Sequence, residues 1–153
     1  MGFDIHRVEA GRPLVLGGVT LPWSKGLQGH SDADIIFHAL TDALMGAVGA
    51  GDIGIYFPDS DPRWKNTPSG MFVSKALELV DKRKFQIENV DVVILTEEPK
   101  LAPHYLPIRR SVAKVLRVEP ARVNIKAKTM ERLGPIGAGE AMAAYAVVLL
   151  REQ

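Results

Sequence analysis

Acidic and histidine side chains near the N-terminus have the types and the spacing of metal ligands. Asp34, His38 and Asp42 recur every four residues in an otherwise apolar stretch, so in a helix they share one face. Asp4 and His6 are two residues apart, so in a strand they point to the same side. Carboxylate oxygens and imidazole nitrogens bind zinc, and three such ligands leave one coordination position for water or substrate. The sequence thus offers Asp4, His6 and His38 as a candidate zinc site.

A second interpretation of these residues stays open. A buried carboxylate or imidazole needs a partner, because burying it alone is costly. That partner is either a metal ion or another polar group of the fold. A single histidine on an apolar helix, such as His38, is more often hydrogen-bonded than metal-bound. The pair of Asp4 and His6 is also weak evidence by itself, so the interpretation depends on the rest of the chain.

Two local elements must position these side chains. Residues 2–6 predict a short strand. A helix is predicted to begin at Ser31 or Asp32 as its N-cap, to run on through Ile35 to Ala47, and to stop at Gly49 or Gly51. Residues 14–20 predict a second strand, in which two consecutive glycines indicate a bulge or a close backbone approach.

The remaining elements follow from apolar runs and helical periodicity. Residues 141–150 are ambiguous, because their alanines favour a helix whereas the run YAVVLL favours a strand. Further strands are predicted at 90–96 and 123–128, helices after Ser69 and at 103–117, and loops at 24–29, 55–68 and 134–139. Together they predict one α+β domain over residues 1–153, in which helices cover one face of a four-stranded sheet. The other face of that sheet needs a partner.

Composition excludes several classes of protein. The 153 residues contain no cysteine, which rules out disulfides, cysteine-bound metals and thiol nucleophiles. The net charge is +1, and the chain contains no run of five basic residues. Its charge therefore does not predict contact with nucleic acid or with a membrane surface. No apolar run reaches 18 residues, and no signal peptide precedes the first strand. We therefore expect a cytoplasmic protein of bacterial type, or a plastid protein if a transit peptide has been removed.

Five segments in order resemble one family: GFDIH, GHSDADIIFHALTDAL, GDIGIYFPDSDP, EEPKLAPH and VNIKAKTMERLG. They resemble the 2-C-methyl-D-erythritol 2,4-cyclodiphosphate synthases of the non-mevalonate isoprenoid pathway, over essentially the whole chain. The resemblance implies conversion of 4-diphosphocytidyl-2-C-methyl-D-erythritol 2-phosphate into the cyclic diphosphate, with release of CMP. It also implies a strand at 141–150, and a homotrimer whose sheets pack around the three-fold axis. Its active sites would lie between adjacent subunits.

This chemistry constrains the residues that are needed. The substrate's own 2-phosphate attacks the β-phosphorus, and because it is already an anion it requires no general base. Catalysis then depends on positioning and on charge stabilisation. The resemblance implies a zinc ion held by Asp4, His6 and His38, whose open position takes a β-phosphate oxygen. It implies a second divalent ion, Mg²⁺ or Mn²⁺, bound by Glu131 between the α- and β-phosphates.

The resemblance also gives roles to residues that would otherwise attract no attention. His30 and Thr129 match transition-state stabilisers that donate hydrogen bonds to phosphate oxygens. Without the resemblance, they would be a loop histidine and a threonine at the end of a strand. Asp42, one turn beyond His38, is interpreted as an acceptor that orients an imidazole. The alternative for Asp42 is a capping or solvated carboxylate.

The substrate-binding residues implied by the resemblance fall into four segments. The first contains the metal ligands, the second binds the erythritol, the third forms the cytidine pocket, and the fourth lies on the diphosphate. They are Asp4, His6, His30 and Ser31; Asp52, Ile53, Gly54, Phe57, Pro58, Asp59, Ser60 and Asp61; Thr96, Glu97, Glu98, Pro99, Lys100, Leu101 and Ala102; and Lys128, Thr129, Met130 and Glu131.

Five positions depart from the family pattern, and two other functions remain as alternatives. Pro135 replaces a frequent aromatic residue, and Ile55 replaces a frequent basic one. Lys128 and Met130 stand where relatives carry threonines, and Ala138 stands where many carry an arginine facing the three-fold axis. One alternative is a zinc phosphohydrolase that uses the same ligands to activate water. The other is a non-catalytic, metal-binding trimer that acts as a scaffold.

Overall fold

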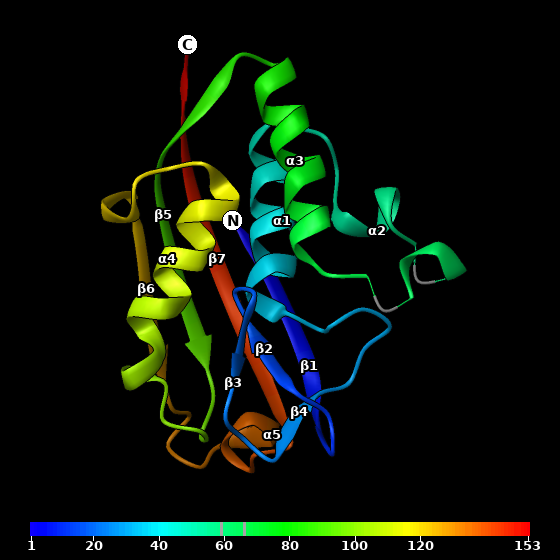
Figure 1. The fold of residues 1–153 in the computed structure, drawn as a ribbon, viewed down its shortest axis with the longest axis vertical. Helices are drawn as coiled ribbons and strands as arrows, with labels where there is room; N and C mark the ends of the chain where they lie inside the picture. Colours follow the sequence, from blue (N-terminus) through cyan, green and yellow to red (C-terminus); the bar gives the residue numbers. More distant parts are fainter. Residues whose placement is uncertain (59, 66) are drawn as a thin grey trace.

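The chain forms a twisted five-stranded sheet with helices on one face (Figure 1). The computed structural model describes residues 1–58, 60–65 and 67–153. In spatial order the strands are β4 (Lys25–Leu27), β1 (Gly2–Ala10), β7 (Ala141–Glu152), β5 (Phe85–Leu95) and β6 (Val123–Lys128). Strands β5 and β6 are parallel, and the other neighbouring pairs are antiparallel. The predicted strand at 141–150 is confirmed as β7.

The prediction of four strands is wrong, because the sheet has a fifth strand. Strand β4 lies within residues 24–29, which predict a loop, and pairs with β1 through Val8–Leu27 and Ala10–Lys25. A three-residue strand carries too little alternation to be seen in the sequence.

The predicted strand at 14–20 is instead a hairpin outside the main sheet. Its strands are β2 (Leu14–Leu16) and β3 (Val19–Leu21), and they pair with each other. Gly17 and Gly18 form the turn with φ angles of +59° and +77°, which suit a two-residue hairpin connection.

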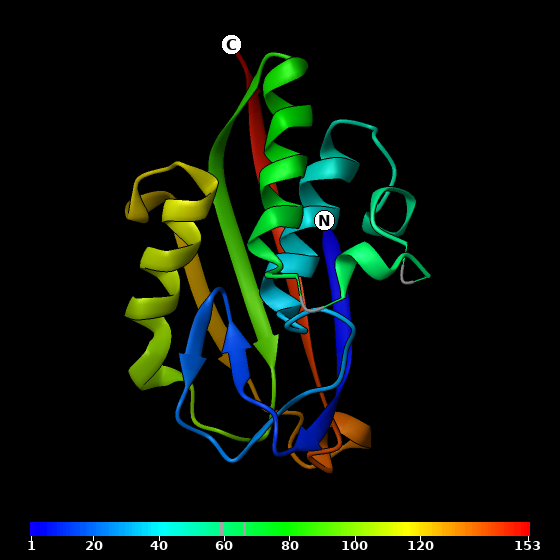
Figure 2. The ribbon, with the colours of Figure 1, turned by 45° about the vertical axis from the view of Figure 1, so that its right-hand side comes forward.

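Three long helices cover one face of the sheet: α1 (Ile35–Ala47), α3 (Gly70–Lys82) and α4 (Tyr105–Leu116) (Figures 1 and 2). Helix α1 packs directly on β1 and β7, and α3 packs beside α1. The core lies between these helices and the sheet, where the inward side chains of β7 are small or flexible, as in Met142, Ala144 and Ala146. Small residues on the strand let α1 approach the sheet closely. Among the described residues, no helix is long and apolar enough to cross a membrane.

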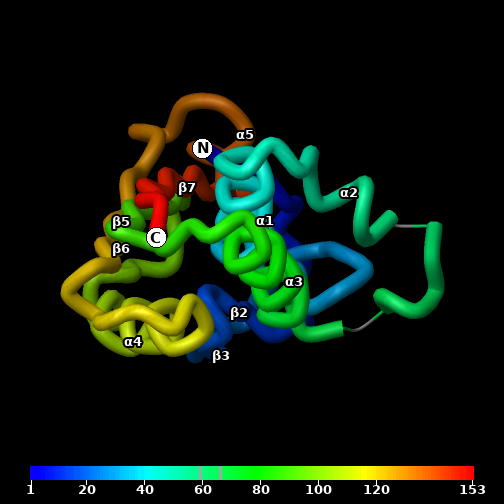
Figure 3. The backbone as a smooth tube through the Cα atoms, turned by 90° about the horizontal axis from the view of Figure 1, so that it is seen from above, coloured from blue at the N-terminus to red at the C-terminus, as the bar shows by residue number. Residues whose placement is uncertain are grey.

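Shorter helical segments occupy the regions predicted as loops. Helix α2 (Ile53–Tyr56) and a 3₁₀ turn at Pro62–Trp64 stand to one side of α1, as the view from above shows (Figure 3). Helix α5 (Gly134–Gly137) replaces the predicted turn at 134–139. Further 3₁₀ turns lie at Ala102–His104 and Pro120–Arg122.

The N-cap of α1 is Asp34, not Ser31 or Asp32. Its Oδ1 accepts hydrogen bonds from the backbone N–H groups of Ile36 (3.1 Å) and Phe37 (3.2 Å). The same carboxylate also accepts from the N–H groups of Gly17 (2.9 Å) and Gly18 (2.6 Å). These glycines thus form a turn rather than the predicted bulge or close backbone approach within a strand, and their hydrogen bonds to the Asp34 side chain join the hairpin to the start of α1.

Strand β1 can lie against α1 because residue 2 is a glycine. A Cβ atom on Gly2 would lie 2.0 Å from the carbonyl oxygen of Ala39 and 2.7 Å from the nitrogen of Ala43. No side chain fits in that space, so the strand backbone touches the helix backbone. This contact brings the side chains that follow on β1 onto the face of α1 that carries His38.

The face of the sheet opposite the helices is apolar and open in the isolated chain. Five side chains on β1 and β7 are between 37% and 60% exposed there, and we call them the open sheet face: Phe3, Ile5, Tyr145, Val147 and Leu149. Phe3 and Tyr145 are cross-strand partners whose ring centroids are 4.6 Å apart. A contiguous apolar surface of this kind marks an interaction site.

Candidate active site

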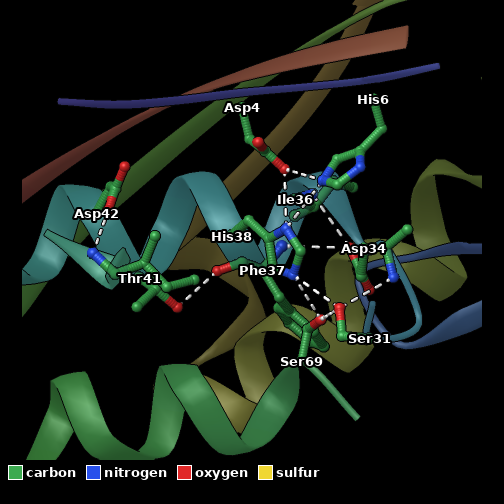
Figure 4. Close-up of polar contacts among 12 residues, drawn as sticks. Asp4, His6, Ser31, Asp34, Ile36, Phe37, His38, Thr41, Asp42 and Ser69 are labelled. Carbon is green, nitrogen blue, oxygen red and sulfur yellow. Dashed lines mark hydrogen bonds and ion pairs between the residues drawn. The ribbon is translucent and has the colours of Figure 1, made fainter. Parts of the chain in front are cut away.

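Asp4, His6 and His38 converge as the sequence predicts (Figure 4). Asp4 Oδ2 lies 2.9 Å from His38 Nδ1 and 3.0 Å from His6 Nε2. The two imidazole nitrogens are 3.3 Å apart. Each residue thus offers one donor atom to a common point between β1 and α1.

The strand and the loop before α1 both make room for this cluster. On β1, Asp4 and His6 point toward the helices, whereas Phe3 and Ile5 point to the open sheet face. Gly29 lies against the His6 ring, where a Cβ atom would be 3.2 Å from Cε1. A larger residue at position 29 would displace the His6 imidazole.

The hydrogen bond of His6 fixes which of its nitrogens faces the cluster. Its Nδ1 lies 2.5 Å from the backbone oxygen of Gln28. A carbonyl oxygen only accepts, so Nδ1 carries the proton and donates it. In the neutral ring, Nε2 is then a lone pair aimed at Asp4 and His38. An imidazole whose far nitrogen donates to a carbonyl is the usual arrangement of a metal-binding histidine.

Asp4 carries the negative charge of the site. Burial alone would raise the pKa of its carboxyl, but the hydrogen bonds that the His38 and His6 rings donate when they are protonated, together with their charge, hold the pKa well below its usual range. The ionised oxygen and the His6 lone pair face the same point and repel each other. A cation at that point would relieve the repulsion. The donor set fits a divalent metal ion with an open coordination position.

A cavity of about 580 Å³, which we call the metal-site cavity, opens beside these three residues. It brings together much of the predicted site, because residues of the loop before α1 and of the segment around α2 line it. The predicted residues lining it are Asp4, His6, His30, Ser31, His38, Asp42, Ile53, Gly54, Phe57, Pro58, Ser60 and Asp61. Asp59 lies outside the described residues, and Asp52 is the N-cap of α2 next to the cavity.

Asp42 has a backbone partner in this structure. Its Oδ1 accepts a hydrogen bond of 2.8 Å from the N–H of Ile53, which fixes the start of α2 against α1. Burial raises the pKa of its carboxyl above the usual value. That Asp42 also orients an imidazole stays a prediction.

An aromatic wall of the cavity contains the predicted Phe57 and two residues that were not predicted for the site, Trp64 and Phe72. Phe57 packs on Phe72 at 4.5 Å and on Trp64 at 5.0 Å between ring centroids. Phe72 follows the helical period of the core face, and Trp64 lies in a segment that predicts a loop. Their only signal in the sequence was the aromatic content of residues 55–64, which does not specify a cavity.

The remaining predicted residues form a second cluster at the ends of the parallel strands β5 and β6. The backbone N–H of Thr96 donates to the oxygen of Lys128 (3.0 Å), which joins the two segments. Glu97 Oε1 accepts from the N–H groups of Met130 (2.7 Å) and Arg132 (3.2 Å).

Within this second cluster the two functional candidates touch. Thr129 Oγ1 donates to Glu131 Oε1 over 3.0 Å. None of residues 96–102 or 128–131 is among the described residues that line the metal-site cavity. The predicted site is therefore divided between two parts of one chain.

The chain is similar in sequence to curated proteins that share one name. A curated 2-C-methyl-D-erythritol 2,4-cyclodiphosphate synthase from Synechococcus sp. (strain JA-2-3B'a(2-13)) is 51% identical over 99% of this chain and 97% of its own. A similarly named protein from Gloeobacter violaceus is 53% identical over 99% of this chain and 93% of its own.

Solved structures show the same fold. A 2C-methyl-D-erythritol-2,4-cyclodiphosphate synthase with bound CDP matches with a TM-score of 0.90 and 42% identity, over 98% of this chain and 97% of that one. The bifunctional IspDF from Campylobacter jejuni matches with a TM-score of 0.95 and 39% identity. That match covers 99% of this chain but 41% of the bifunctional one. The model of the YgbB family matches residues 1–151, and the chain belongs to this family.

Proposed function

We propose that the chain converts 4-diphosphocytidyl-2-C-methyl-D-erythritol 2-phosphate into 2-C-methyl-D-erythritol 2,4-cyclodiphosphate and CMP. This is a step of isoprenoid precursor synthesis by the non-mevalonate pathway. The observation that carries the proposal is the convergence of Asp4, His6 and His38 at a cavity, in a chain of this family.

The proposed reaction is an intramolecular phosphoryl transfer. An oxygen of the 2-phosphate forms a bond to the β-phosphorus, and the bond from that phosphorus to the oxygen of CMP breaks. The nucleophile is already an anion and CMP leaves as one, so the protein need not remove a proton. Its task is to hold three phosphate groups together, which is a matter of position and charge.

The residues of the cavity suit this task. We assign a zinc ion to Asp4, His6 and His38, where it would supply Lewis-acid stabilisation of a β-phosphate oxygen. His30 lines the same cavity and has a donor for a phosphate oxygen. Ile53 and Gly54 present backbone to the cavity beside Asp52, whose carboxylate is a suitable acceptor for erythritol hydroxyls.

The second cluster supplies the nucleotide side of the site. We assign Glu131 to a second ion, Mg²⁺ or Mn²⁺, and Thr129 to a phosphate oxygen. The pocket for cytidine is assigned to residues 96–102, and a related structure with bound CDP supports a cytidine nucleotide as the ligand.

We also propose that the active site is completed in a homotrimer. The open sheet face is large and apolar, and it lies opposite the face that the helices cover. The two clusters of site residues are separate within one chain, so an adjacent subunit would bring the second cluster to the metal-site cavity. Packing of three open sheet faces around an axis would bury them.

One assay distinguishes this activity from the two alternatives. The protein is incubated with the cytidylyl substrate and Mg²⁺, and the products are separated. The proposed activity gives CMP and the cyclic diphosphate in equal amounts. Release of inorganic phosphate would instead indicate a phosphohydrolase, and unchanged substrate would indicate a non-catalytic protein.

A further inference from the structure

Ser69 stands at the N-cap of α3, but its hydroxyl does not cap that helix. The residue is fully buried, and its side chain makes no hydrogen bond to the N–H groups of α3. Its Oγ lies instead 2.8 Å from Nε2 of His38 (Figure 4). A serine at this position ordinarily accepts from its own helix, so the contact with His38 replaces a stabilising interaction.

Asp32 determines which partner receives the hydroxyl proton of Ser69. Its Oδ2 accepts from the backbone N–H of Ser69 over 3.1 Å, and its Oδ1 accepts from Ser69 Oγ. The carboxylate oxygen is the acceptor of this hydrogen bond, and the hydroxyl of Ser69 is the donor. Ser69 Oγ can then only accept from His38, so its hydrogen bond with that ring forms when Nε2 carries the proton.

We propose that Asp32 and Ser69 are positioning residues that fix the tautomer of His38. The chain of donors runs from His38 Nε2–H to Ser69 Oγ and from Ser69 Oγ–H to Asp32. It leaves Nδ1 of His38 as a lone pair, 2.9 Å from Asp4 Oδ2. This inference rests on the proposed metal site, for which it supplies the third donor atom.

The two histidines of the site are then held in the same manner from opposite sides. The backbone oxygen of Gln28 accepts a hydrogen bond from His6 Nδ1–H, and Ser69 Oγ accepts one from His38 Nε2–H. In both rings the remaining nitrogen faces Asp4. Acceptors of this kind behind metal-binding imidazoles change metal affinity by about 10- to 100-fold.

A nucleophilic role for Ser69 does not fit the same contacts. Ser69, His38 and Asp4 are linked in the order of a Ser–His–Asp triad. However, Ser69 has no exposed surface, and its hydroxyl donates to Asp32 rather than to His38. A triad serine must instead donate its proton to the histidine and reach the substrate.

A neighbouring hydroxyl provides the competing arrangement. Ser31 Oγ lies 3.2 Å from the same Nε2 and accepts from the N–H of Ala33 over 3.2 Å. If Ser31 donated to Nε2, the ring proton would move to Nδ1 and point at Asp4. That tautomer would present no lone pair to a metal ion, so the position of one proton separates the two arrangements.

Two substitutions test the chain of donors. Ser69→Ala removes the acceptor of the His38 proton. Asp32→Asn changes no heavy-atom count, but its amide can donate to Ser69 Oγ and so free the serine proton for His38 Nε2. The matched control is Ser74→Ala, because Ser74 lies on the same helix and its hydroxyl donates to the backbone oxygen of Gly70.

Two measurements are made on each full-length variant. The affinity for Zn²⁺ is measured by competition with a chromophoric chelator. The protonated ring nitrogen of His38 is identified in the metal-free protein at alkaline pH, by proton–nitrogen correlation spectra of histidine-labelled samples. Circular dichroism confirms that each variant is folded.

We expect Nε2–H for His38 in the wild type and in Ser74→Ala, with equal zinc affinity. Asp32→Asn should shift the ring toward Nδ1–H, and both test variants should bind zinc 10- to 100-fold more weakly. Wild-type His38 protonated at Nδ1, or zinc affinities equal to that of Ser74→Ala, would overturn the inference. If the wild type itself bound no zinc, the proposed metal site would fail instead.

Discussion

At the scale of single residues, the candidate metal site is a set of ligand atoms. The protons of its two imidazole rings lie on the nitrogens that face away from it. His6 Nδ1 donates a hydrogen bond to the backbone oxygen of Gln28, and the two imidazoles lower the pKa of Asp4 when they are protonated. The lone pairs of these ligand atoms face one another and repel. A metal ion placed between them would remove this repulsion. The strength of the site thus depends on side chains and carbonyls behind it as well as on the ligands themselves.

Removal of one ligand should release the metal. We expect about one zinc ion per chain in the wild type and a loss of most of it in His38→Ala, because two ligands hold zinc poorly. Turnover should fall at least about 100-fold. Metal analysis after desalting, together with the product assay, measures both. His104→Ala is the control, since His104 does not line the metal-site cavity; a full zinc content in His38→Ala would exclude His38 from the site.

Glu131 should affect the second metal ion alone. Glu131→Gln keeps the shape of the side chain and its contact with Thr129 but removes the charge that attracts Mg²⁺. Zinc content should be unchanged, while half-saturation with Mg²⁺ moves to concentrations higher by about 10-fold or more. Rates measured over a Mg²⁺ titration test this, with Glu119→Gln as the control. Identical titrations for the two variants would show that Glu131 is not a ligand.

At the scale of elements, the site is assembled by the contact of β1 with α1 and by the cap of α1. Gly2 allows the strand to touch the helix, and Asp34 joins the helix to the turn between β2 and β3. Both features lie within a few residues of a metal ligand. The local stability of these elements therefore decides whether the ligands meet.

A methyl group at residue 2 should separate β1 from α1. In Gly2→Ala the new Cβ would overlap the backbone of Ala39 and Ala43, so we expect a loss of stability of about 1–3 kcal/mol from overpacking and weaker zinc binding. Gly46→Ala is the control, because a Cβ there meets nothing within 4 Å and alanine favours a helix. Chemical denaturation and zinc titration measure the two effects. If both variants were equally stable, the proposed backbone contact would be wrong.

The buried cap of α1 should contribute more than an exposed cap. Asp34→Ala would leave four backbone N–H groups without their acceptor, those of Gly17, Gly18, Ile36 and Phe37. We expect a loss of about 3 kcal/mol or more, because each buried donor left without a partner is costly. Asp52→Ala removes the exposed cap of α2 and should lose about 1 kcal/mol or less. Denaturation midpoints compare them, and equal losses would contradict the structure.

These elements also show how far the sequence predicts the fold. The four-residue spacing of His38 and the two-residue spacing of Asp4 and His6 are local patterns, and the three side chains converge as these patterns predict. The hairpin at Gly17 and the strand β4 are too short to give a periodic signal. The strand at 85–95 begins before its predicted start because pairing with β7 extends it. The helix at 105–116 begins after its predicted start because a 3₁₀ turn precedes it.

Contacts between distant segments explain what the sequence does not predict. Ser69 reads as a helix cap, and only the packing of α3 beside α1 places its hydroxyl on His38. Gly2 has no side chain, so nothing in the sequence indicates that the β1 backbone contacts α1 there. The aromatic wall formed by Phe57, Trp64 and Phe72 likewise depends on how the segment after α2 folds back onto α3.

At the scale of the whole molecule, the open sheet face and the division of the site point to the same assembly. The apolar side chains of β1 and β7 need a partner surface, and the metal-site cavity needs the second cluster. A trimer would satisfy both needs at once. Assembly and activity should therefore be lost together.

A charge on the open sheet face tests this coupling. Val147 is half exposed in the middle of that face, and Val147→Glu would bring three carboxylates together in the trimer. We expect monomers by light scattering, with a native circular dichroism spectrum and a turnover at least about 100-fold lower. The control is Met71→Glu, an exposed apolar residue on α3. A fully active monomeric Val147→Glu would show that each chain contains a complete site.

Strand β1 presents two surfaces from one short run of residues. Asp4 and His6 face α1, whereas Phe3, beside Asp4, and Ile5, between the two, lie on the open sheet face. Substitutions in this run can change either surface separately, because neighbouring positions belong to different sides. A change of length cannot, since one inserted or deleted residue would exchange every side chain between the two sides. Across homologous chains this segment should accordingly vary in sequence with a period of two but never in length.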